Sequence, residues 1–100
     1  MILTVDIGNT NRTIGVFSDN DLLFTARLAT DRKRTEDQYA VELLNIFKLR
    51  NADISEFSGA IISSVVPELT DVLKAAVASV TDKDPMILRN DIGSGLKVIN

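Results

Sequence analysis

The sequence predicts one α/β domain built on a mixed five-stranded sheet with helices on its faces. Three short apolar segments follow one another first, and two segments with helical periodicity come after them, each leading into another strand-like segment. Neighbouring strands joined by tight turns pair antiparallel, whereas strands joined through a helix favour parallel pairing. The predicted order is therefore strand, strand, strand, helix, strand, helix, strand (βββαβαβ).

The three amino-terminal strands are separated by turn-forming residues. Ile2 to Ile7 is short, apolar and β-branched, as in a buried strand. Gly8 to Asn11 has turn chemistry, and Arg12 to Phe17 is again rich in strand-forming residues. Ser18 to Asp21 is a second turn, and Leu22 to Leu28 forms the third strand. We expect these segments to form an antiparallel meander.

The first helix begins with a capping box. In Thr35-Glu36-Asp37-Gln38, the threonine side chain can accept from the backbone three residues on, while the glutamine side chain reaches back. Apolar residues then recur at helical spacing and form one face. These residues are Ala40, Leu43, Leu44 and Phe47. We expect the helix to end near Arg50.

The second half of the chain alternates strands with a helix. Gly59 to Val66 is a continuous β-prone run, which is typical of a strand covered on both faces. Pro67 suits the first helical position, and an amphipathic helix follows it. Its apolar residues are Leu69, Val72, Leu73, Ala76, Val77 and Val80. Met86 to Leu88 predicts the last strand of the sheet, Asp91 to Gly95 a loop, and Leu96 to Ile99 the beginning of another strand.

The composition indicates a single globular domain over residues 1–100. Of its 100 residues, 45% are hydrophobic and 25% are charged, which excludes a disordered tail. The net charge of -3 without a basic stripe argues against binding nucleic acid. Without cysteine or histidine, the chain offers no thiol nucleophile and no histidine base. With no apolar run of roughly 18 residues and no basic leader, we expect a cytoplasmic protein with no membrane partner.

The turn after the first strand carries more chemistry than a turn requires. Asp6 ends that strand, where open α/β sheets place their ligand crevices. Magnesium binds through carboxylates, waters and phosphate oxygens, so one acid beside free N–H groups suits a magnesium–nucleotide. Gly8 leaves room for a phosphate, and the amides and hydroxyl that follow can donate to it. Arg12 or Thr13 could add to this site.

A plain β-hairpin is the alternative interpretation of the same residues. Asp, Gly and Asn are the usual turn formers, so their presence alone does not require a ligand. Against this alternative, the loop holds more polar groups than a two-residue turn needs. The order Asp-x-Gly-Asn-Thr is also specific, not only the composition.

Four stretches, in register, resemble a known enzyme family. They are "DIGNTN" at residues 6–11, "TDRKRTEDQY" from Thr30 to Tyr39, "SSVVP" from Ser63 to Pro67 and "GSGLK" from Gly93 to Lys97. The chain is similar along its whole length to the amino-terminal part of type III pantothenate kinases. These belong to the acetate-and-sugar-kinase, actin and heat-shock-chaperone superfamily. The resemblance implies a ribonuclease H-like sheet forming half of an actin-like ATPase.

The resemblance also implies an activity. The family is a transferase that phosphorylates pantothenate with ATP to 4'-phosphopantothenate, the first step of coenzyme A biosynthesis. It works as a homodimer with Mg2+, and many members need a monovalent cation, K+ or NH4+. By position, Asp6 would hold the metal, and Asn100 would line the pantothenate pocket. The residues implied for ATP binding are Asp6, Ile7, Gly8, Asn9, Thr10, Asn11, Arg12 and Thr13. Arg12 stands one position away from the basic residue that the family commonly has.

Members of the family are considerably longer than this chain. After the position of Asn100 they carry a Gly-Ala-Asp-Arg segment whose acid is taken as the catalytic base, and then a second domain of similar fold. We therefore expect residues 1–100 to supply one wall of the ATP cleft, to hold no catalytic residue and to be inactive alone. Two alternatives are a non-catalytic nucleotide-binding or regulatory module of the same superfamily, and an interaction domain whose hairpin is only a turn.

Overall fold

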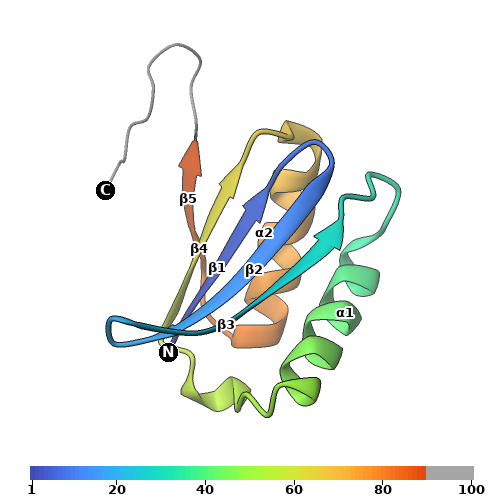
Figure 1. The fold of residues 1–100 in the computed structure, drawn as a ribbon. Coiled ribbons are helices and arrows are strands. Elements are labelled where there is room, and N and C mark those ends of the chain that lie inside the picture. Colours follow the sequence, from blue (N-terminus) through green and yellow to red (C-terminus); the bar gives the residue numbers. More distant parts are fainter. Residues whose placement is uncertain (90–100) are drawn as a thin grey trace.

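The computed structural model describes residues 1–89, and Figure 1 shows their arrangement. The elements follow the predicted order, with one short 3-10 helix added before the fourth strand. They are β1 (Ile2–Ile7), β2 (Asn11–Ser18), β3 (Asp21–Ala29), α1 (Glu36–Leu49), η1 (Ile54–Glu56), β4 (Gly59–Ser64), α2 (Pro67–Thr81) and β5 (Met86–Arg89). The first strand matches its predicted bounds, and the others differ from them by a few residues at most.

The five strands form one mixed sheet with β1 at its centre. The strand order is β3-β2-β1-β4-β5. The meander pairs antiparallel, β1 with β2 and β2 with β3. The strands reached through helices pair parallel, β1 with β4 and β4 with β5. The predicted α/β class and mixed sheet are confirmed, and β1 places its carboxyl end between β2 and β4.

Both described helices cover the same face of the sheet and pack side by side (Figure 1). Along β1, Leu3, Val5 and Ile7 are buried on this helix face, while the residues between them are more exposed. We call the other side the open face. The prediction that β4 is covered on both faces is wrong for residues 1–89, because Ile61 and Ser63 on the open face are only half-buried.

The ends of α1 follow the predicted chemistry. The Thr35 backbone N–H donates to the Gln38 side chain at 2.8 Å, and the Gln38 backbone N–H donates to the Thr35 hydroxyl at 3.2 Å. These reciprocal bonds satisfy donors that a helix leaves unpaired in its first turn. The apolar face is narrower than predicted, since Leu44 is exposed. The helix buries Tyr39, Leu43 and Phe47.

The second helix begins at Pro67, as predicted, and ends before Asp82, which adopts a left-handed conformation. Its buried residues are Leu69, Thr70, Leu73, Ala76, Val77, Val80 and Thr81. The short η1 helix was not predicted, although Asp53 gives a local signal for it. The Asp53 carboxylate accepts from the Ser55 hydroxyl and backbone N–H, and these bonds lower the pKa of Asp53 below its ordinary value.

Part of the predicted chain lies outside the described residues. This concerns the loop predicted from Asp91 to Gly95, the strand predicted to begin at Leu96 to Ile99, and the pantothenate contact expected from Asn100. Among residues 1–89, neither helix has the length and apolar character needed to cross a membrane.

Candidate nucleotide site

Asp6 stands exposed on the open face at the carboxyl end of β1. Because side chains alternate along a strand, the buried Val5 and Ile7 place Asp6 on the side away from the helices. The register aligns Thr13 of β2 on one side of Asp6 and Ser63 of β4 on the other. Side chains paired in this way across neighbouring strands lie close together. A carboxylate flanked by two hydroxyls therefore faces solvent at the centre of the sheet.

The β1–β2 turn lies directly beyond Asp6. Gly8 and Asn11 close it with a bond from the Gly8 N–H to the Asn11 carbonyl at 2.9 Å, leaving Asn9 and Thr10 as the two turn residues. Within residues 1–89, the backbone N–H groups of Asn9 and Thr10 donate to no acceptor, and both residues are exposed. A side chain at position 8 would place its Cβ 3.2 Å from the Asn11 carbonyl, so glycine keeps this turn tight. The turn thus presents unbonded donors.

The segment after β3 supports this turn from the side. The Thr30 backbone N–H donates to the Thr10 carbonyl, and the Thr30 hydroxyl donates to the Gly8 carbonyl, each at 2.8 Å. The C=O and N–H groups of a trans peptide point in opposite directions. Since Thr30 binds the Gly8 carbonyl, the N–H of the same peptide, that of Asn9, points away from Thr30. The support therefore fixes the direction in which the turn offers a donor.

Arg32 makes a further contact with the turn. Its Nη2 donates to the side-chain oxygen of Asn9 at 2.9 Å, and its Nε lies 3.0 Å from the carboxylate of Glu68 in the first turn of α2. Neither a role for Glu68 nor the contacts of Thr30 and Arg32 with the turn are predicted from the sequence. These contacts join segments twenty or more residues apart, so no local sequence pattern predicts them.

Arg12 does not share the exposed position of Asp6. It is 2% exposed, and its guanidinium binds the Glu42 carboxylate at 2.5 Å and the Ala29 carbonyl at 2.8 Å. It also lies over the Tyr39 ring, 4.7 Å from the centroid. Arg12 points to the helix face because its partner in the register is the buried Ile7. Its position thus does not support the prediction that it lines the ATP phosphates.

Tyr39 and Ile7 also belong to the interior. The Tyr39 hydroxyl donates to the Asp31 carbonyl, and burial raises the pKa of Tyr39 above its ordinary value of 10.0. This bond ties α1 to the loop that carries Arg32. The Ile7 side chain is fully buried, so only its backbone is near the candidate site. The Ile7 carbonyl accepts from the Val65 N–H at 3.0 Å, which fixes the end of β1 against the start of α2.

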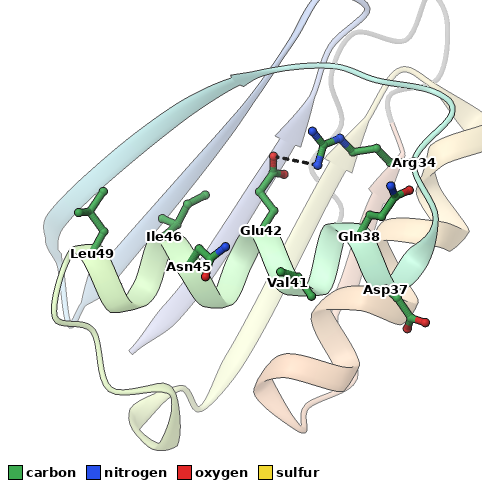
Figure 2. A pocket seen from close by; sticks show the side chains of 8 residues that line it. All are labelled: Arg34, Asp37, Gln38, Val41, Glu42, Asn45, Ile46 and Leu49. Atoms are coloured by element: carbon green, nitrogen blue, oxygen red, sulfur yellow. Dashed lines mark ion pairs between the residues drawn. The ribbon is translucent and has the colours of Figure 1, made fainter.

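A hollow of about 580 Å³ lies elsewhere, along α1. Figure 2 shows its lining side chains, which come from α1 and from Arg34 before it. The residues are Arg34, Asp37, Gln38, Val41, Glu42, Asn45, Ile46 and Leu49. None of the residues from Asp6 to Thr13 lines it. We therefore place the candidate site at the β1–β2 turn.

The residues at the turn fit a magnesium–phosphate group better than a bare metal ion. In the part of the chain that the structure describes, no cluster of three acidic side chains could hold a metal by itself. Mg2+ usually keeps several waters and takes one or two carboxylates together with phosphate oxygens. One exposed carboxylate at Asp6, next to unbonded backbone N–H groups at Asn9 and Thr10, matches this requirement.

Comparison with known proteins identifies the family. A family model described as "Type III pantothenate kinase" matches residues 2–99. The chain belongs to the type III pantothenate kinase family. Proteins called type III pantothenate kinase from Listeria welshimeri and Listeria innocua are 40% and 39% identical to it over 98 residues, which is 98% of this chain. The family resemblance stated from the four sequence stretches is confirmed. The chain spans 38% of the length of these relatives.

A solved structure supports the fold independently. The ROK hexokinase from Thermus thermophilus superposes with a TM-score of 0.63 at 12% sequence identity, covering 89% of this chain and 35% of the hexokinase chain. At this identity the likeness concerns the fold alone. The α/β sheet of this family member therefore has the architecture found in a sugar kinase.

Proposed function

We propose that this chain is the ATP-binding part of a kinase that transfers a phosphoryl group from ATP to pantothenate, giving 4'-phosphopantothenate for coenzyme A synthesis. The observation that supports this most strongly is the supported β1–β2 turn, with unbonded N–H groups beside exposed Asp6. Catalysis of phosphoryl transfer depends on positioning and on electrostatic stabilisation of the phosphates, and a fixed turn of this kind supplies both.

Each residue of the turn has a specific task in this proposal. The backbone N–H groups of Asn9 and Thr10 donate to phosphate oxygens, and Gly8 allows the close approach. Asp6 orients the waters and the Mg2+ ion of the bound nucleotide, while Thr13 beside it adds a hydroxyl. When bound, Mg2+ neutralises charge on the phosphates. Arg12 keeps the strand behind the turn in place.

The remaining parts of the proposal follow from family membership. Pantothenate, a homodimeric assembly, a monovalent cation such as K+ or NH4+ and a cytoplasmic location are proposed for the whole protein. Residues 1–100 supply one wall of the cleft, so we expect turnover to require the opposite wall as well. We expect the base that accepts the pantothenate proton to lie outside residues 1–100, because Asp6 is assigned to the metal.

Isothermal titration of Mg-ATP into the full-length protein tests the proposal, with Asp6→Asn as the variant. We expect the variant to bind about 10–100-fold more weakly, as when other groups that orient a metal are removed. Asp21→Asn is the matched control, because Asp21 is also exposed and stands at the other turn of the meander. Equal affinity in the Asp6 and Asp21 variants would contradict the proposal.

A turnover assay on the same protein separates the enzyme from the alternative. Phosphorylation of pantothenate that is lost in Asp6→Asn supports the kinase. Mg-ATP binding without any turnover would instead support a non-catalytic nucleotide-binding module. If the full-length protein binds no Mg-ATP, the turn is an ordinary β-hairpin turn and the proposal is overturned.

A further inference from the structure

Arg32 connects the β1–β2 turn to the start of α2 through two different nitrogens. Nη2 donates to the Asn9 side-chain oxygen at 2.9 Å, and Nε lies 3.0 Å from Glu68. A guanidinium is planar, so two contacts on separate nitrogens fix its plane as well as its position. The ion pair is well exposed, with 46% of Arg32 and 58% of Glu68 accessible, and such pairs add little to stability. An orienting role explains the arrangement better than a stabilising one.

The contact with Arg32 determines which way the Asn9 amide faces. A guanidinium has only donors, so the amide must turn its oxygen towards Arg32 and its NH2 group away. Within residues 1–89 the NH2 group of Asn9 has no hydrogen-bond partner, and the residue is exposed. Asn9 therefore offers side-chain donors at the same turn that offers unbonded backbone donors.

We propose that Arg32 is a positioning residue for nucleotide binding: held by Glu68, it orients Asn9 so that the amide NH2 donates to a phosphate oxygen. This inference rests on the proposed function of the turn. In this proposal Arg32 acts through Asn9, with its Nη2 held by the Asn9 side chain and its Nε by Glu68. Arg32 thus couples the loop after β3 to the nucleotide site.

A double-mutant cycle on the full-length protein tests this coupling. The variants are Arg32→Ala, Asn9→Ala and the two together, and the measurement is the Kd for Mg-ATP by titration calorimetry. We expect each single variant to bind about tenfold more weakly, in the range of one charge-assisted hydrogen bond. The double variant should bind no more weakly than Asn9→Ala alone, because Arg32 acts only through Asn9.

Two further measurements separate the proposed role of Arg32 from simpler roles. Lys33→Ala is the matched control, because Lys33 is an exposed cation in the same loop and its ammonium makes no ion pair within residues 1–89. The affinity of this variant for Mg-ATP should equal that of the wild type. The thermal unfolding midpoint of Arg32→Ala should stay close to that of the wild type, because an exposed ion pair adds little to stability, and this result excludes general unfolding as the cause of weaker binding. Additive losses in the double variant would overturn the proposal and indicate direct contact between Arg32 and a phosphate.

Nuclear magnetic resonance of the Asn9 side-chain NH2 group, without nucleotide, tests the orientation itself. We expect its order to fall in Arg32→Ala and to fall partly in Glu68→Gln, while Lys33→Ala leaves it unchanged. Unchanged order in Arg32→Ala overturns the inference even if the wild-type protein binds Mg-ATP. If Arg32 orders Asn9 but the wild-type protein binds no Mg-ATP, the proposed function fails and the phosphate role of Arg32 fails with it.

Discussion

The β1–β2 turn and the β2–β3 turn close the two ends of β2, and the surroundings of the two turns differ. Thr30 makes two hydrogen bonds to the β1–β2 turn and Arg32 makes a third. At the β2–β3 turn, no side chain within residues 1–89 bonds to Asp19 or Asn20. Both turns contain an exposed asparagine, Asn9 in one and Asn20 in the other, so composition alone does not separate them.

The backbone of the two turns differs as well. Asp19 adopts a left-handed conformation with φ of 57°, whereas Asn9 and Thr10 keep negative φ angles. The β2–β3 turn is formed by local chemistry, because Asp is among the residues that tolerate this conformation. The β1–β2 turn depends on contacts with distant segments. A binding site needs its donors fixed before the ligand arrives, and external support provides this.

Of all the variants, the replacement of Arg12 behind the β1–β2 turn should lower the free energy of unfolding the most. Arg12→Ala leaves the Glu42 carboxylate, which is 15% exposed, without its main partner behind the β1–β2 turn. Breaking a buried pair from one side typically costs about 3 kcal/mol, so we expect a loss of that size in the free energy of unfolding. Urea denaturation followed by circular dichroism measures it.

Two further variants sharpen the result. Arg27→Ala removes an exposed arginine from β3 and should change stability by no more than about 0.5 kcal/mol. Arg12→Met combined with Glu42→Met should recover most of the loss, because an apolar pair of similar volume avoids an unpaired buried charge. A loss in Arg12→Ala as small as that in Arg27→Ala would show that the pair does not support the turn.

Removing the Thr30 hydroxyl should have an intermediate effect. Thr30→Val keeps the shape of the side chain but leaves the Gly8 carbonyl without the bond it accepts at 2.8 Å. We expect the protein to lose about 1 kcal/mol of stability, which is typical of one hydrogen bond. We also expect weaker Mg-ATP binding in the full-length protein, since the turn becomes less fixed. Thermal unfolding and calorimetry measure the two effects.

Thr25→Val is the matched control for this variant. Thr25 lies on β3, is exposed, and its hydroxyl has no hydrogen-bond partner within residues 1–89. Valine suits a strand, so the control should be neutral or slightly stabilising. If both variants changed stability and affinity alike, the Thr30 hydroxyl would have no specific role at the turn.

The fold was predictable from sequence because its signals are local. Short apolar segments with β-branched residues marked the strands, a capping box marked the start of α1, and Pro67 marked the start of α2. The support of the β1–β2 turn was not predictable in this way. Thr30 and Arg32 reach it across 22 and 23 residues, and only the packing of the sheet brings them together.

The position of Arg12 could have been found from the sequence by counting along the hairpin. A two-residue turn at Asn9 and Thr10 pairs Gly8 with Asn11 and therefore Asp6 with Thr13. Since neighbours in a strand face opposite sides, Arg12 then lies on the side away from Asp6. The family resemblance drew attention to the charge of Arg12, whereas the register determines where that charge points.

Changing the β2–β3 turn should have the smallest effect. In Asp19→Gly the left-handed conformation becomes easier, but the unfolded chain gains freedom, so the two contributions nearly cancel. We expect a stability change within about 0.5 kcal/mol, measured by thermal unfolding. Mg-ATP affinity should not change, because the eight residues of β2 place this turn roughly 26 Å from the other. A drop in affinity would mean that the two turns are coupled along β2, and the contrast between a local turn and a supported one would no longer hold.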